Sequence, residues 1–131
     1  MSSTHKQIEA LCYLIIDKYK PLMFLDAHKI RIKYDKDMDE DNIMECEPAF
    51  PYFNATIHYG DSALKLFEKH KNNKKEQRDV FTEYIVHELF HIITAGLADK
   101  AVQRFVSENE ISRELETLTD HIMKIIVNLN K

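Results

Sequence analysis

The sequence predicts an α+β fold in a single domain spanning residues 1–131, with a small, twisted, mostly antiparallel sheet. Apolar residues recur at helical spacing in three long stretches, and two short stretches near the middle alternate apolar with polar residues. The chain has 131 residues, 44% of them hydrophobic, which is enough material for one core. We expect an N-terminal helix before the sheet, then a buried helix and a C-terminal helix that carries several glutamates.

The N-terminal helix is predicted over residues 4–19, where apolar side chains recur on one face. Thr4 can serve as its N-cap. Pro21 should end the helix, because proline has no main-chain N–H to donate.

The sheet is predicted from two alternating stretches and one shorter stretch. Residues 28–35 alternate isoleucine and tyrosine with lysine and arginine, which is typical of a half-buried strand. Residues 54–60 form a second predicted strand, and a short strand is expected near residues 43–46. The segment between the last two contains two prolines, so it should be irregular or lie at an edge of the sheet.

Three helices should follow the sheet. A short helix is expected at residues 62–70, and a long one should begin between residues 76 and 79 and end near residue 97, with Gly96 as its terminator. The last helix covers residues 108–129. Its apolar face should pack on the core and consists of Ile111, Leu115, Leu118, Ile122, Ile125, Ile126 and Leu129.

Charge and cysteine content exclude several classes of protein. The formal net charge of −4 gives no basic footprint for nucleic acid. The two cysteines, Cys12 and Cys46, form neither a Cys-x-x-Cys pair nor a disulfide framework. The N-terminus lacks the pattern of a signal peptide, and no stretch has the apolar length to span a bilayer. We therefore expect a cytoplasmic protein with no membrane or nucleic-acid partner.

The long predicted helix carries the motif His-Glu-x-x-His at residues 87–91. Residues four apart share one face of a helix, so His87 and His91 can present two imidazoles to one metal ion. Glu88 is rotated by about 100° from His87, too far to be a comfortable ligand but close enough to reach a water on that metal. A zinc ion lowers the pKa of such a water, and Glu88 can then accept its proton.

The apolar surroundings of the motif also favour a metal. Apolar residues cover most of this helix, which indicates that it is central and largely buried. Two histidines and a glutamate there would be costly without a partner, and Zn²⁺ is the simplest one. A catalytic zinc site needs a third protein ligand and an open position for water.

The C-terminal helix carries Glu116 and Asp120 at the spacing E-x-x-x-D, with Thr119 between them. Together with His-Glu-x-x-His, this pattern resembles the gluzincins, the thermolysin-like zinc peptidases, and the small zinc-peptidase-like proteins often encoded by phages and bacteria. The resemblance covers roughly the last fifty residues and is strong only at the motif itself. It implies a minimal zincin-like fold, with Glu116 as third ligand and Asp120 orienting a zinc histidine. The metzincin pattern fails, because Thr94 and Leu97 stand where that family has glycine and histidine.

Helical phase leaves the third ligand open. Glu116 lies on one flank of the predicted apolar stripe and Glu114 on the other. Further alternatives on the same helix are Glu108, Glu110, Asp120 and His121.

The predicted strand at 54–60 is the candidate for pairing with an extended substrate. Its Asn54-Ala55 resembles the Asn-Ala that thermolysin-like enzymes place on their substrate strand. His58 or Tyr59 could point at the metal and stabilise an oxyanion.

Two functional hypotheses follow. The first is a zinc metallopeptidase that hydrolyses peptide or protein substrates, with His87, His91 and Glu116 as ligands and Glu88 as base. The alternative is a non-catalytic protein that keeps the zincin scaffold and a structural or vestigial metal site as a binding or regulatory module. An open fourth coordination position would favour hydrolysis, and a fourth protein ligand would favour a structural site. The sequence leaves the oligomeric state undetermined.

Overall fold

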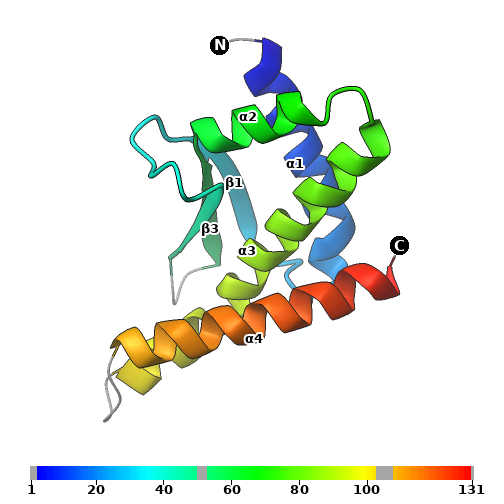
Figure 1. Cartoon of the computed structure of the whole chain (residues 1–131). Helices are drawn as coiled ribbons and strands as arrows, with labels where there is room; N and C mark the ends of the chain where they lie inside the picture. The colour runs from blue at the N-terminus through cyan, green and yellow to red at the C-terminus, as the bar shows by residue number, and fades with distance from the viewer. Residues whose placement is uncertain (1–2, 50–52, 103–107, 131) are drawn as a thin grey trace.

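The computed structural model describes residues 3–49, 53–102 and 108–130, and of these residues 96–102, 108, 110 and 111 by their backbone alone. Within these ranges the chain forms four helices and a three-stranded sheet (Figure 1). The elements in chain order are α1 (Ser3–Leu22), β1 (Lys29–Tyr34), β2 (Met44–Pro48), β3 (Asn54–Tyr59), α2 (Asp61–Lys69), α3 (Lys74–Val102) and α4 (Glu108–Leu129). The α+β class is therefore as predicted.

The sheet is mixed, which corrects the prediction that it is mostly antiparallel. Its strand order is β1-β3-β2, with β3 parallel to β1 and antiparallel to β2. β1 and β2 form the two edges of the sheet, and β3 lies between them although it follows both in the sequence. Strands that enter a sheet from the same end run parallel, so this order makes one of the two pairings parallel.

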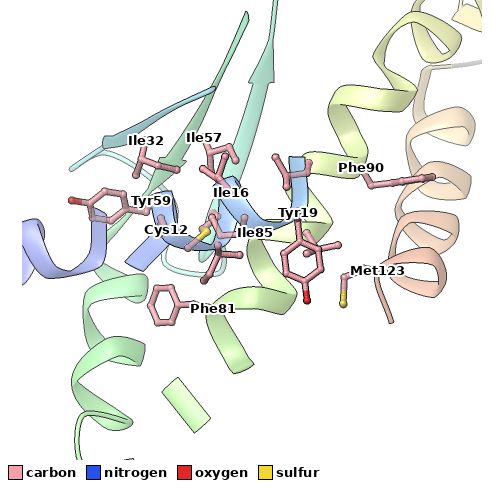
Figure 2. Packing of buried hydrophobic residues seen from close by; sticks show 14 of the residues in the cluster. Cys12, Ile16, Tyr19, Ile32, Ile57, Tyr59, Phe81, Ile85, Phe90 and Met123 are labelled. Carbon is pink, nitrogen blue, oxygen red and sulfur yellow. The ribbon is translucent and has the colours of Figure 1, made fainter. Parts of the chain in front are cut away.

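One face of the sheet forms the core with α1 and α3. Ala55, Ile57 and Tyr59 alternate along β3 toward that face and are buried. α1 packs on β1, α3 packs on β2, and the two helices pack on each other. Figure 2 shows side chains of the sheet meeting those of both helices; the residues it labels from these three elements are Ile32, Ile57, Tyr59, Cys12, Ile16, Tyr19, Phe81, Ile85 and Phe90.

α1 ends later than predicted, because Pro21 lies inside its last turn. Proline removes only its own N–H, so the residues after it can still donate to the preceding turn. The Leu25 N–H donates to the Lys20 carbonyl at 2.9 Å. Phe24 takes the left-handed conformation, with φ of 57°, and this reverses the chain.

α3 is longer than predicted at both ends. Asn73 caps its start, since the Asn73 side-chain oxygen accepts the Glu76 N–H at 3.1 Å. The helix then continues through Gly96 to Val102, which corrects the predicted end. Glycine ends a helix where it adopts a left-handed conformation; within a helix it costs only about 1 kcal/mol relative to alanine.

α4 is rotated relative to the prediction, so only part of the predicted face packs on the core. Ile122 and Ile126 of that face pack against the core. Thr119, Met123 and Val127 are buried, and α4 packs along α3 (Figure 1). Three members of the predicted apolar face are exposed instead: Leu118, Ile125 and Leu129.

Among the described residues, no helix combines the length and the apolar character that crossing a membrane requires.

Candidate metal centre

Three residues of the motif lie at the boundary between the core and solvent on α3. Apolar neighbours hold this part of the helix in the core, and Val86 and Leu89 are fully buried. His87 and His91 are half-buried, whereas Glu88 is buried. The histidines therefore face an accessible space, and the glutamate faces the interior of the protein.

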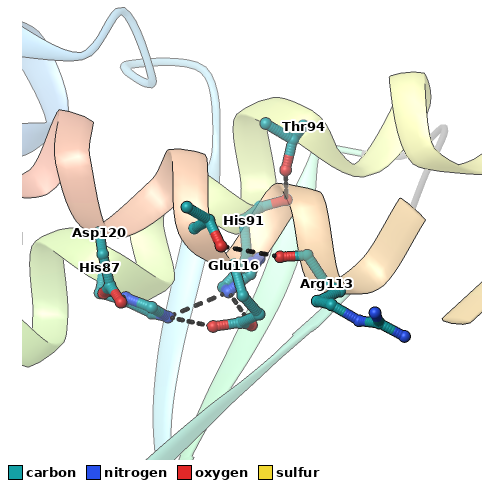
Figure 3. A network of polar contacts seen from close by, with 7 residues as sticks. His87, His91, Thr94, Arg113, Glu116 and Asp120 are labelled. Carbon is teal, nitrogen blue, oxygen red and sulfur yellow. Dashed lines mark hydrogen bonds and ion pairs between the residues drawn. The ribbon is translucent and has the colours of Figure 1, made fainter. Parts of the chain in front are cut away.

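The two histidines converge on one carboxylate of α4. The Nε2 atoms of His87 and His91 lie 3.1 Å apart. The Glu116 carboxylate contacts both: Oε2 is 3.1 Å from His87 Nε2, and Oε1 is 2.8 Å from His91 Nε2. Figure 3 shows this arrangement, with both imidazoles turned toward Glu116. Two nitrogens and a carboxylate thus point at one place from two helices.

Asp120 determines which nitrogen of His87 can bind a cation. Its Oδ1 lies 2.8 Å from His87 Nδ1, and a carboxylate can only accept, so Nδ1 carries the proton. In a neutral imidazole, Nε2 then holds a lone pair. That lone pair faces the acceptor oxygens of Glu116. Two acceptors at this distance need either a second proton on His87 or a metal ion between them, and the donor set fits a metal ion.

The separations also fit a small divalent cation. In a tetrahedral zinc site with bonds of about 2.0–2.1 Å, ligand atoms lie about 3.3 Å apart. The observed separations of 2.8 to 3.1 Å require outward shifts of only a few tenths of an ångström. Imidazole and carboxylate ligands also suit other transition metals, so the donor set is not specific for zinc.

Glu88 lies beside the histidines without sharing their orientation. Its carboxylate oxygen and the imidazole nitrogens of His87 and His91 all lie within 4.8 Å of one another. Burial, and then the charge of Glu116, raise the pKa of Glu88 to about 8, and the main-chain N–H of Cys46 opposes that rise. A cation bound to the histidines would also lower it. A carboxyl group with a pKa near neutrality can serve as a general base.

β2 is the strand that borders Glu88. In the antiparallel ladder, Ala49 N–H donates to the Asn54 carbonyl and Gly60 N–H donates to the Ile43 carbonyl. Bonded positions alternate along a strand, so the main-chain groups of Cys46 point away from β3 and toward the open edge.

This direction agrees with the contact between Cys46 N–H and Glu88. It also explains Pro48, which can occupy an outward position because it has no N–H for the ladder. The role of the Cys46 N–H could not be predicted from the sequence, because a main-chain group leaves no signal in residue type.

The strand predicted to pair with a substrate lies in the middle of the sheet, which corrects that expectation. Asn54 and Ala55 belong to β3, and β3 pairs with β1 on one side and β2 on the other along its full length. A strand paired on both sides has no edge for a peptide. The edge next to the site belongs to β2, because the chain places β3 between the two earlier strands.

The two candidate oxyanion residues also point elsewhere. The Tyr59 hydroxyl lies 2.9 Å from His5 Nδ1 of α1, inside the core. His58 faces the opposite side of β3, and its Nε2 lies 2.9 Å from Glu47 Oε2. The alternation of side chains along β3 turns one residue to each face, so neither contacts the histidines of α3 among the described interactions.

α4 brings Glu116 and Asp120 to α3, and the other candidate ligands take no part in the described contacts. Glu114 and His121 are exposed. The side chains of Glu108 and Glu110 lie outside the described residues. Glu116 and Asp120 contact the histidines on the side of α4 where Met123 and Val127 are buried, and Leu118 faces solvent.

Comparisons with protein-family models, with curated proteins and with solved structures find no match to this chain.

Proposed function

We propose that this chain is a zinc-dependent metallopeptidase on a minimal zincin-like scaffold. The observation that carries the proposal is the convergence of His87, His91 and Glu116 within 3.1 Å of one another. These three residues would hold the metal and leave one coordination position open. The His87 contact with Asp120 supports the proposal, because ligating histidines commonly donate their second N–H to a carboxylate.

A zinc ion bound there would supply a Lewis acid and lower the pKa of a water molecule. Glu88 would accept the proton of that water and pass it to the leaving amine. Burial raises the pKa of Glu88 to about 8, which is near the neutral range in which a general base works best. Asp120 would hold the imidazole of His87 in the tautomer that leaves Nε2 free.

The substrate would be an extended peptide laid along the open edge of β2. The Cys46 N–H contacts Glu88, so a peptide paired with the neighbouring outward main-chain groups of β2 would pass the base. Such a peptide would lie near the water that Glu88 would deprotonate.

Metal content tests the binding part of the proposal. Purified protein dialysed against buffer with trace zinc should contain about one zinc per chain by inductively coupled plasma mass spectrometry. His91→Ala should lose the metal, and His121→Ala, an exposed histidine on α4, should keep it. A wild-type chain that folds normally and binds no divalent metal would contradict the proposal.

Hydrolysis tests the catalytic part. Glu88→Gln should retain the metal and lose cleavage of a fluorescence-quenched peptide library, because an amide cannot accept the proton. Glu76→Gln, an exposed glutamate at the start of the same helix, should cleave like the wild type. Equal cleavage by Glu88→Gln and the wild type would exclude Glu88 as the base.

A non-catalytic metal-binding module is the second candidate. Glu116 and Asp120 are 54% and 55% exposed, so the site lies near the surface with little chain around it to build a deep cleft. Full metal occupancy together with no cleavage by the wild type across the peptide library would favour this candidate.

A further inference from the structure

Two exposed glutamates, Glu45 and Glu47, lie on β2, the edge strand beside the candidate metal centre. Side chains alternate along a strand, so both carboxylates belong to the outer face of the sheet, whereas Met44 and Cys46 pack toward the core. Residues two apart in a strand are separated by about 6.6 Å. The edge therefore presents two carboxylates at the repeat distance of an extended chain.

Neither carboxylate is paired with a lysine or an arginine among the described residues. The Asn42 side-chain N–H donates to Glu45 Oε1 at 2.6 Å, and Glu47 Oε2 lies 2.9 Å from His58 Nε2. Each of these contacts uses one oxygen, and an ionised carboxylate offers about four lone-pair sites. Both glutamates can therefore accept hydrogen bonds from a cationic side chain that lies beside β2.

The negative charge of this edge reaches the metal centre. Residues 35–47 carry seven acidic side chains and one basic side chain, Lys36. Burial and the charge of Glu116 are the larger causes of the raised pKa of Glu88, and the charge of Glu45 adds to them. Glu45 therefore lies close enough to act on the proposed base, and a peptide that passes the base also passes Glu45.

The hydrogen-bond pattern of β2 determines which peptide residues would face the two glutamates. The main-chain groups of Glu45 and Glu47 point toward β3, because bonded positions alternate between the Ile43–Gly60 and Ala49–Asn54 hydrogen bonds. In an antiparallel strand added to the open edge, the residues opposite both glutamates thus form non-hydrogen-bonded pairs. These are the closer kind of pair, with Cα atoms about 4.5 Å apart.

We propose that the peptide bound along β2 carries lysine or arginine at two positions two residues apart, which pair with Glu45 and Glu47. The residue between them lies opposite Cys46, and its side chain points to the same face of the sheet as that of Cys46, toward α3. The preferred sequence is thus basic-x-basic, with the middle residue next to the metal centre. Adjacent basic residues would point to opposite faces, so only one of them could meet a glutamate.

This inference rests on the proposed function for the location of the peptide and adds its chemical class. Cleavage is not needed to test it, because binding can be measured without hydrolysis. The probes are two fluorescein-labelled heptapeptides of the same composition and charge, Thr-Thr-Lys-Val-Lys-Thr-Thr and Thr-Thr-Lys-Lys-Val-Thr-Thr. Fluorescence anisotropy with zinc-treated Glu88→Gln protein gives a dissociation constant for each, and the first should bind roughly two- to fivefold more tightly.

Substitutions on β2 test which residues read the peptide. Glu45→Gln and Glu47→Gln, each combined with Glu88→Gln, should each weaken binding of the Lys-Val-Lys peptide by roughly two- to fivefold, because one cross-strand charge pair is lost. Glu40→Gln is the matched control, since it removes the same charge from an exposed residue of the preceding loop. It should leave the difference between the two peptides unchanged.

Charge reversal gives a result that loss of folding cannot produce. With both Glu45→Lys and Glu47→Lys in the same Glu88→Gln protein, a Thr-Thr-Glu-Val-Glu-Thr-Thr peptide should bind more tightly than the Lys-Val-Lys peptide. Equal affinities for the two lysine peptides, or unchanged affinity in both glutamine variants, would overturn the inference. Binding with the expected preference by a wild-type chain that hydrolyses no peptide would contradict the proposed function and support this inference.

Discussion

The Nδ1 atom of His87 lies 2.8 Å from Oδ1 of Asp120, which follows Glu116 by one helical turn on α4. This contact fixes the proton of His87 on the nitrogen that faces away from Glu116. We predict that Asp120→Ala keeps the fold and lowers metal affinity by about 10- to 100-fold. Competition with a chromogenic zinc chelator measures the change.

Asp17→Ala is the matched control for this substitution, since Asp17 is an exposed aspartate on α1. Asp120→Asn should give an intermediate affinity, because the amide oxygen can still accept the His87 N–H but carries no charge. An affinity for Asp120→Ala equal to that of the wild type would mean that the contact does not orient His87 in the metal-bound protein.

Zinc should raise the thermal stability of the chain, because the centre joins α3 to α4. A ligand that binds only the folded state stabilises it by about 2.7 kcal/mol at a hundredfold excess over its dissociation constant. We predict that excess zinc raises Tm and that a chelator reverses the shift. His91→Ala should melt at the same temperature with and without zinc, and a zinc-induced shift in this variant would place the metal elsewhere.

Replacing Thr119 with valine should stabilise the folded protein. It is fully buried, and its hydroxyl has no hydrogen-bond partner among the described residues. An unsatisfied buried hydroxyl costs about 1–3 kcal/mol, and valine has nearly the same shape without that cost. We predict that Thr119→Val raises the free energy of unfolding by about 1 kcal/mol in urea denaturation.

Thr117→Val provides the comparison for Thr119. Thr117 is exposed, and its hydroxyl donates to the Arg113 carbonyl at 3.2 Å. Its replacement should change stability by no more than about 0.5 kcal/mol. Destabilisation by Thr119→Val would indicate that the hydroxyl binds a buried water.

Alkaline pH should weaken the fold through Cys12. Burial, and then the charge of Glu9, raise the pKa of the Cys12 thiol to about 12. An unfolded cysteine loses its proton near pH 8.5, so between about pH 9 and pH 12 the unfolded chain binds fewer protons than the folded one. Stability then falls as pH rises, by at most about 1.4 kcal/mol per pH unit from this group.

Urea unfolding of the wild type and of Cys12→Ala at several pH values measures this contribution. The buried hydroxyl of Tyr59 also has a raised pKa and contributes with the same sign, so both proteins should weaken with pH. The slope should be smaller for Cys12→Ala. Equal slopes would show that Cys12 titrates alike in both states.

The local part of this architecture could be predicted from the sequence. Spacing alone placed His87, Glu88 and His91 on one helix, and alternation placed β1 and β3. These predictions succeed because side-chain direction in a helix or strand is set by the backbone a few residues away.

The order of the strands and the rotation of α4 could not be predicted in the same way. β2 lies at the edge and β3 in the middle because of where the chain crosses the sheet, which no residue pattern encodes. For α4, the most apolar stripe was expected inside, but Glu116 and Asp120 turn toward His87 and His91. Met123 and Val127 are buried on the side of α4 that makes these polar contacts, which leaves Leu118 and Ile125 exposed to solvent.

Every side chain proposed for the metal centre lies between residues 87 and 120, on two consecutive helices. Bringing these side chains together requires only that α3 and α4 pack against each other, and the sheet supplies none of them. The contacts of Glu116 and Asp120 with the two histidines span 25 to 33 residues, whereas the strands pair residues that are 7 to 25 apart. Since contacts close in sequence form first, the metal would act late in folding and lock the C-terminal helix onto a body that is already assembled.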